Sequence, residues 1–162
     1  MSSFIAIDTN IWHFAFVKPK EVEFQEIHKR AKKFTLEKLR DTKTRIAMSS
    51  YQLAEILEVL RKSGVPRNVL LKLLEDFMSA KFYVVELTKQ HVSKAVKLSW
   101  SSNIHVYDYL VAIPLKGIVT EIFSADDHFQ HEHFMRIAKI TNPLEPWVIR
   151  EGRRPKRLSK PT

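Results

Sequence analysis

Apolar residues occur along the chain in short continuous runs that alternate with longer stretches of mixed polarity. Continuous runs of this length are typical of strands that are buried on both faces of a parallel sheet. They predict strands at residues 4–7, 46–48, 82–87 and 121–125, and an edge strand within 135–140.

The stretches between these runs carry apolar residues at intervals of three and four, which is the spacing of one face of a helix. They predict helices over residues 21–40, after a cap at Ser49 or Ser50, after Pro66, after Thr88, and from Val106 to a break at Pro114. Because strands alternate with helices, the sequence predicts an α/β fold, a three-layer α/β/α sandwich with a mainly parallel central sheet.

The 162 residues are enough for one domain with a sizeable core. We expect that domain to span residues 1–149, because residues 150–162 are basic and have almost nothing to bury, which is typical of a flexible tail. The absence of cysteine excludes a disulfide scaffold, a cysteine-ligated zinc and a thiol nucleophile, and it fits a cytoplasmic location. No apolar run is long enough to cross a bilayer, so we expect no membrane partner.

Lys and Arg number 27 against 18 Asp and Glu, which gives a formal net charge of +9. A chain this basic favours polyanions such as nucleic acid, or an acidic protein partner. The helix predicted over residues 21–40 carries Lys29 and Lys33 on its polar face, and the tail contains Arg153 and Arg154. These four residues are the candidate phosphate-binding positions, and a merely solvated basic face is the alternative.

Acidic residues directly follow two of the predicted strands, at the edge of the sheet where open α/β folds bind ligands. Asp8 follows the first predicted strand, and Asp126 and Asp127 follow the fourth. Asp108 lies near a helix start beside core-facing residues, whereas Glu55 lies off the apolar stripe of its helix, where periodicity alone leaves it in solvent. Each acid could instead serve as a turn, helix-start or surface residue.

Four short stretches place an acidic residue in a recognisable context. IAIDTNIW ends an apolar strand in Asp-Thr-Asn, SSYQLAEILEVL joins a small polar residue to a helical Glu, YDYLVA opens a helix on an Asp, and SADDHF follows a strand with S-x-D-x-x-F. In this order, over residues 4–129, they resemble the motifs of PIN-domain nucleases and, within that family, of the VapC-like toxins of prokaryotic toxin–antitoxin pairs.

The resemblance implies a catalytic quartet of Asp8, Glu55, Asp108 and Asp126. Converging carboxylates repel one another, and a divalent cation removes that repulsion. Oxygen ligands suit Mg²⁺ or Mn²⁺. The resemblance implies that Asp8, Asp108 and Asp126 hold the metal, while Glu55 is a ligand or positions the attacking water.

Supporting roles follow from the same resemblance. It implies that Asn10 could orient Asp8, that Ser124 could hold the fourth acid, and that Ser50 assists. Asp127 directly follows Asp126 and is therefore the alternative ligand. The spacing between Asp126 and the following phenylalanine favours Asp126.

The function implied is metal-dependent hydrolysis of RNA phosphodiester bonds, leaving a 5′-phosphate and a 3′-hydroxyl. The implied role is that of the toxin in a type II toxin–antitoxin system, with a small antitoxin as partner and a homodimer as the assembly. The alternatives are a housekeeping RNA-processing nuclease and a non-catalytic RNA-binding protein on the same fold.

Two other clusters have competing interpretations. His128, His131 and His133 could form a separate transition-metal site, but a polar surface stretch is the favoured interpretation. Trp12, Phe14 and Phe16 could stack on bases, but core packing or a dimer contact is favoured.

Overall fold

The computed structural model describes residues 3–149 and 154–155. Within this part of the chain, five strands form one parallel sheet in the order β3-β2-β1-β4-β5. The strands are β1 Ser3–Ile7, β2 Thr44–Ser49, β3 Phe82–Val85, β4 Glu121–Phe123 and β5 Lys139–Thr141. A separate antiparallel pair joins β6 Val148–Ile149 to β7 Arg154–Pro155.

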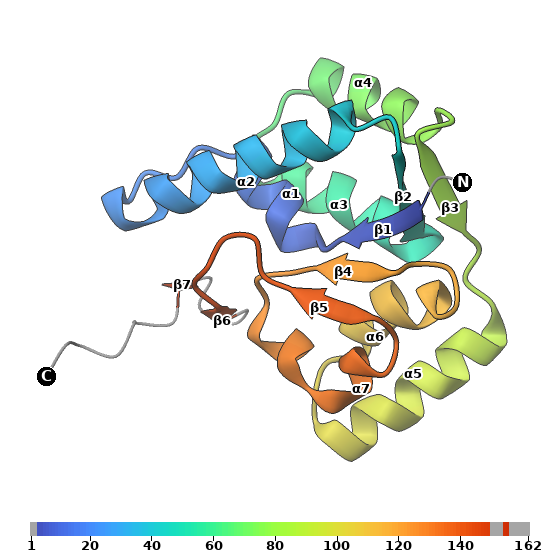
Figure 1. The fold of residues 1–162 in the computed structure, drawn as a ribbon. Coiled ribbons are helices and arrows are strands. Elements are labelled where there is room, and N and C mark those ends of the chain that lie inside the picture. The colour runs from blue at the N-terminus through green and yellow to red at the C-terminus, as the bar shows by residue number, and fades with distance from the viewer. Residues whose placement is uncertain (1–2, 150–153, 156–162) are drawn as a thin grey trace, which may run out of the picture.

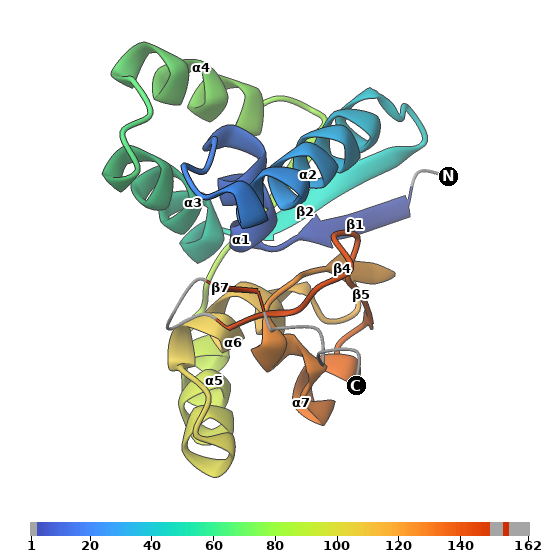
Figure 2. The ribbon, with the colours of Figure 1, turned by 90° about the vertical axis from the view of Figure 1, so that its left-hand side faces the viewer.

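Helices cover both faces of this sheet, so the molecule has three layers (Figure 1; Figure 2). One face is covered by α1 Thr9–Phe16, α2 Val22–Arg40, α3 Ser50–Lys62 and α4 Arg67–Phe77. The opposite face is covered by α5 Lys89–Ser102, α6 Val106–Ala112 with the 3₁₀ turn η1 Ile113–Leu115, η2 Asp127–Gln130 and α7 Glu132–Met135. The predicted three-layer α/β/α sandwich with a parallel sheet is therefore confirmed.

The continuous apolar runs are explained by two hydrophobic cores, one on each side of the sheet. Ile5 and Ile7 of β1 pack into the core under α1 to α4, whereas Ala6 between them packs into the core under α5 to α7. In β4, Phe123 packs into the core under α1 to α4 and Ile122 into the core under α5 to α7. Because successive side chains of a strand point to opposite faces, a sheet that is buried on both faces needs apolar residues at consecutive positions.

Several element boundaries differ from the sequence prediction. Helix α1 was not predicted, because its apolar residues form an almost continuous run after Asp8 rather than an amphipathic stripe. Strands β3 and β4 end two residues early, and β5 begins only at Lys139 because α7 ends at Met135 and residues 136–138 form a turn. Pro114 lies in η1, where α6 ends as predicted.

Helix α1 carries the aromatic residues that follow Asp8. Trp12 and Phe14 are buried in the core, and Trp12 Nε1 donates a hydrogen bond to the Ile7 carbonyl at 3.1 Å. Phe16 remains partly exposed. Core packing, rather than base stacking, therefore accounts for the first two aromatic residues.

Two predictions from the sequence concern the C-terminal end of the chain. Residues 150–153 and 156–162, including Arg153, lie outside the described residues, and of Arg154 only the backbone is described, within β7. The boundary between a domain ending at 149 and a flexible tail stays a prediction. None of the helices in the described ranges has both the length and the apolarity that a membrane crossing requires.

Candidate functional site

The site lies where the strand order of the sheet reverses. From β1 the chain proceeds to β2 and β3 on one side, and then returns to β4 and β5 on the other side of β1. The carboxyl ends of β1 and β4 are neighbours, with Ile7 opposite Phe123 and the Asp8 N–H bonded to the Phe123 carbonyl at 2.8 Å. Such a switch point is where open α/β sheets bind their ligands.

Asp8 is fixed at the end of β1 by contacts to both of its carboxylate oxygens. Oδ1 accepts the backbone N–H of Thr9 at 2.8 Å, so Asp8 caps α1, and Oδ2 accepts the Ser124 hydroxyl at 2.7 Å. Only 5% of the Asp8 surface is exposed. Asp8 can cap the helix and also bind a metal ion, because capping uses one edge of the carboxylate and leaves its other lone pairs available.

The backbone beneath Asp8 is held by buried side chains. The Ile7 carbonyl accepts hydrogen bonds from Trp12 Nε1 and from Gln52 Nε2, the latter at 2.6 Å. Gln52 comes from α3 and is fully buried. These bonds tie β1, α1 and α3 together next to the first acid, and such rigid support is what a precise site requires.

Asp126 lies beyond the end of β4 and is as buried as Asp8. Its N–H donates to Ser124 Oγ at 3.0 Å, and its Oδ1 accepts the His128 N–H at 2.9 Å. Ser124 thus contacts Asp126 through the Asp126 backbone, while its own hydroxyl proton is donated to Asp8. Burial raises the pKa of the Asp126 carboxyl, Asp127 and Glu55 add to that rise, and the His128 contacts oppose it.

Asp127, the alternative to Asp126, points elsewhere. Its Oδ1 accepts Gln130 Nε2 at 2.6 Å, and Asp127 does not line the cavity that the other acids share. The geometry therefore favours Asp126 as the fourth acid.

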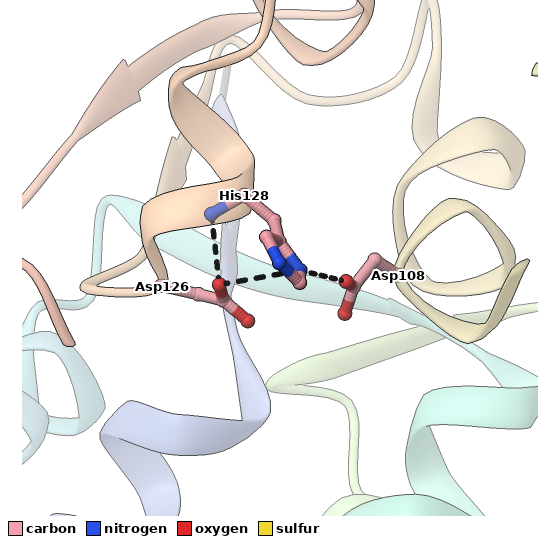
Figure 3. A group of neighbouring side chains, drawn as sticks. All are labelled: Asp108, Asp126 and His128. Carbon is pink, nitrogen blue, oxygen red and sulfur yellow. Dashed lines mark hydrogen bonds and ion pairs between the residues drawn. The ribbon is translucent and has the colours of Figure 1, made fainter. Parts of the chain in front are cut away.

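Asp108 reaches the site from the first turn of α6 and is 3% exposed. His128 lies between it and Asp126: Nδ1 is 2.9 Å from Asp108 Oδ2 and 3.8 Å from Asp126 Oδ1 (Figure 3). The nearest oxygen and nitrogen atoms of these three side chains all lie within 4.8 Å of one another, close enough to share a metal ion.

The three histidines predicted as one polar surface stretch are therefore divided. His128 joins the acids, whereas His133 Nδ1 is bonded to the Tyr109 hydroxyl at 2.9 Å and His131 Nδ1 accepts the His133 N–H. The prediction was wrong for His128 because the 3₁₀ turn η2 directs its ring back toward Asp126, and no helical or strand periodicity reports such a turn.

Glu55 is half-buried at the site rather than in solvent. Its Oε1 accepts the Thr9 hydroxyl and its Oε2 accepts the Tyr51 hydroxyl at 2.9 Å. The helical wheel of α3 left Glu55 on the polar side, but α1 packs against α3 there and covers it. Because α1 was not predicted, its contact with Glu55 could not be predicted either.

Asp8, Glu55, Asp108 and Asp126 line one cavity of about 190 Å³. Its polar wall consists of Asp8, Thr9, Asn10, His13, Glu55, Asp108 and Asp126, and its apolar wall of Phe14, Val59 and Val148. Asn10 Oδ1 is buried without a hydrogen-bond partner, so the predicted contact of Asn10 with Asp8 is not formed through this atom. The carboxylate oxygens of the cavity, the His128 nitrogen beside Asp108 and Asp126, and an amide oxygen without a partner fit a divalent cation.

Other predicted site residues lie outside the cavity. Ser50 Oγ accepts the Leu87 N–H at 3.0 Å and so ties α3 to the segment after β3, while the neighbouring Ser49 caps α3. Lys29 and Lys33 are exposed on α2, as the amphipathic pattern predicted.

The described fold is an α/β sandwich with a carboxylate-lined cavity at the switch point of a parallel sheet, an arrangement suited to a divalent cation. Residues 5–135 match the PIN domain family, and the chain belongs to that family. PIN domains are typically metal-dependent nucleases.

Among solved structures, the chain is similar to one in the crystal structure of VapBC2 from Rickettsia felis bound to a DNA fragment from their promoter. The TM-score is 0.54 at 17% sequence identity, over 86% of this chain and 98% of that chain. At this identity the likeness shows a shared fold. A comparison with curated proteins gives no match.

The two residues whose hydroxyls hold Glu55 were not identified from the sequence. Tyr51 lies four positions before Glu55 in α3, and side chains at this spacing are neighbours on a helix, so the i,i+4 relation was a usable signal. Thr9 follows Asp8 directly and reaches Glu55 across 46 positions, which no local signal indicates.

Proposed function

We propose that the chain is a metal-dependent endoribonuclease that hydrolyses RNA phosphodiester bonds. The observation that carries this proposal is the convergence of Asp8, Glu55, Asp108 and Asp126, from four separate segments of the chain, on one cavity. Four partly or fully buried acids at one place are costly for the fold unless a cation or a reaction requires them.

In this proposal Asp8, Asp108 and Asp126 hold Mg²⁺ or Mn²⁺, directly or through water. The bound cation supplies a more acidic water and neutralises charge on the phosphoryl oxygens. Burial raises the pKa of Asp126 because it disfavours the charged carboxylate, and a bound cation would offset that cost.

Glu55 orients the attacking water and accepts its proton. The hydroxyls of Thr9 and Tyr51 hold its two carboxylate oxygens, so the group is fixed before the substrate arrives. Ser124 fixes Asp8 in the same way. In-line attack on the phosphorus then leaves a 5′-phosphate and a 3′-hydroxyl.

RNA binding draws on the basic surface of the protein. The net charge of +9 and the exposed Lys29 and Lys33 on α2 support a polyanionic substrate. Arg153 and Arg154 are proposed to contribute in the same way. These contacts hold phosphates and do not select a base.

We further propose that this ribonuclease is the cytoplasmic toxin of a type II toxin–antitoxin system and acts as a homodimer. It is supported by the VapC-like motifs and by the fold shared with a chain of VapBC2. An antitoxin segment with a basic side chain would be recognised by the acidic cavity. A housekeeping RNA-processing nuclease is the alternative, and a small gene next to this one whose product relieves growth arrest would favour the toxin.

The proposed activity is tested with a set of matched variants assayed on RNA with Mg²⁺ or Mn²⁺. Asp8→Asn and Glu55→Gln should abolish cleavage, while Glu58→Gln, an exposed acid on the same helix paired with Arg61, should leave it intact. Asp126→Asn should be inactive and Asp127→Asn active. Circular dichroism checks folding, and cleavage that persists in Asp8→Asn with excess EDTA would overturn the proposal.

A further inference from the structure

Two tyrosines stack beside the acidic cavity. The rings of Tyr51 on α3 and Tyr107 on α6 lie 5.8 Å apart between centroids, with planes inclined by only 11°. Nearly parallel rings at this distance are in the offset-stacked arrangement that aromatic pairs prefer. The pair therefore joins α3 and α6, the two helices that supply Glu55 and Asp108.

The pair is connected to the candidate catalytic residues through both of its members. The Tyr51 hydroxyl donates to Glu55 Oε2 at 2.9 Å. Tyr107 immediately precedes Asp108, but Tyr107 is 51% exposed whereas Asp108 is 3% exposed. The chain thus passes within one residue from an exposed ring to a buried side chain that lines the cavity, so the exposed ring belongs to the immediate neighbour of a cavity residue.

We propose that Tyr107, supported by Tyr51, is a stacking platform for a nucleobase of single-stranded RNA next to the phosphate at the acidic cavity. The carboxylates handle a phosphate and a cation and offer nothing to the apolar face of a base. An exposed aromatic ring offers that face, and it does so for any base, because every base has a π-face. This inference rests on the proposed ribonuclease function and adds a base-binding subsite to it.

Exposure alone does not define this platform. Trp100 on α5 is more exposed, at 82%, but it is several residues away from Asp108, whereas Tyr107 directly precedes Asp108 and stacks on the tyrosine that holds Glu55. Trp100 is therefore a matched control, an exposed aromatic residue of the same layer whose loss should not affect base binding. A contact of Tyr107 with a second copy of the chain is the competing use of the ring.

The test measures binding separately from cleavage. Fluorescence anisotropy in EDTA compares a labelled oligo(A) RNA with a ribose–phosphate oligomer of equal length and charge that lacks bases. The wild-type protein should bind oligo(A) more tightly. Tyr107→Ala should weaken oligo(A) binding about tenfold and leave the abasic oligomer unchanged, since loss of one stacked base has an effect of about this size.

Three controls accompany this measurement. Tyr107→Phe keeps the ring and should bind as the wild type does, Trp100→Ala should bind as the wild type does, and sedimentation reports the oligomeric state. The platform would be overturned if Tyr107→Ala lost binding to both oligomers equally, or lost none. It would also be overturned if the wild type did not bind oligo(A), or if a change of assembly accounted for the loss.

Different kinetic results would contradict the stacking platform and the ribonuclease activity. Absence of divalent-dependent RNA cleavage by the wild type contradicts the ribonuclease, whatever Tyr107 does. If the wild type cleaves RNA, and Tyr107→Ala cleaves the same RNA with unchanged KM, the ribonuclease stands and the platform is wrong. The expected result is a raised KM with kcat nearly unchanged, because the ring is not at the reacting atoms.

Discussion

The hydroxyl of Ser124 donates a hydrogen bond of 2.7 Å to Asp8 Oδ2, although 116 positions separate the two residues. The same oxygen accepts the N–H of Asp126 at 3.0 Å. One fully buried serine therefore sets the positions of the first and the fourth acid together. This bridge between the ends of β1 and β4 makes Ser124 a positioning residue of the site.

Ser124→Ala should lower both activity and stability. It leaves Asp8 Oδ2 and the Asp126 N–H without this partner, and an unsatisfied buried polar group costs about 1–3 kcal/mol in free energy of unfolding. Urea denaturation and RNA cleavage measure the two effects. Ser124→Thr, which retains the hydroxyl, should recover most of the activity, and Ser101→Ala, at an exposed position of α5, should have no effect on either quantity.

Tyr51→Phe should lower kcat about tenfold with little change in KM. It removes the hydroxyl that holds Glu55 Oε2 but keeps the ring stacked on Tyr107. A tenfold loss corresponds to about 1.4 kcal/mol, the order of a hydrogen bond to a charged group. Steady-state kinetics with Tyr83→Phe on β3 as the control would measure it, and an unchanged kcat would show that Tyr51 does not position Glu55.

Asp126→Asn should raise Tm by a few degrees in EDTA at neutral pH. Since the pKa of Asp126 is raised by burial, the folded state binds more protons than the unfolded state above pH 3.8. The stability that this group contributes therefore falls as pH rises through the raised pKa. Asparagine keeps the oxygen that accepts the His128 N–H and removes the charge.

The pH dependence of Tm provides the check on this prediction. The gain in Tm should shrink at acidic pH, where the wild-type carboxyl is itself protonated. With Mn²⁺ present the order should reverse, because the wild type binds the ion more tightly than the variant. A variant that is less stable than the wild type at neutral pH in EDTA would contradict the assignment.

The Mn²⁺ complex should show nitrogen hyperfine coupling from His128. Its Nδ1 lies 2.9 Å from Asp108 Oδ2 and within the cluster formed with Asp126, so an ion held by these two carboxylates would be within reach of the imidazole. Pulsed electron paramagnetic resonance should detect the coupling in the wild type and in His131→Asn. Retention of the nitrogen signal in His128→Asn would exclude this imidazole as its source.

Lys29→Gln combined with Lys33→Gln should weaken RNA binding and its salt dependence. Each lost phosphate contact lowers the slope of log K against log salt by about 0.7 for single strands. Lys94→Gln with Lys97→Gln removes the same charge from α5, on the opposite layer of the sandwich. If both pairs reduce the slope equally, α2 provides no specific path for RNA.

The sequence by itself determined the alternation of strands and helices and the position of Asp8 and Asp126 after their strands. Both follow from local rules: an apolar run that is buried on two faces becomes a parallel strand, and parallel strands bring their carboxyl ends to one edge. The PIN motifs then connected these acids with Asp108 and Glu55.

Only the tertiary structure determined how the site is assembled. Glu55 is enclosed because the Thr9 hydroxyl reaches it from α1. Ser124 joins the ends of two strands, and the turn η2 brings the His128 ring to Asp108. Tyr107 meets Tyr51 from another helix. These contacts join residues that are distant in the sequence, or depend on an irregular turn, whereas periodicity reports only which face of a single element a residue occupies.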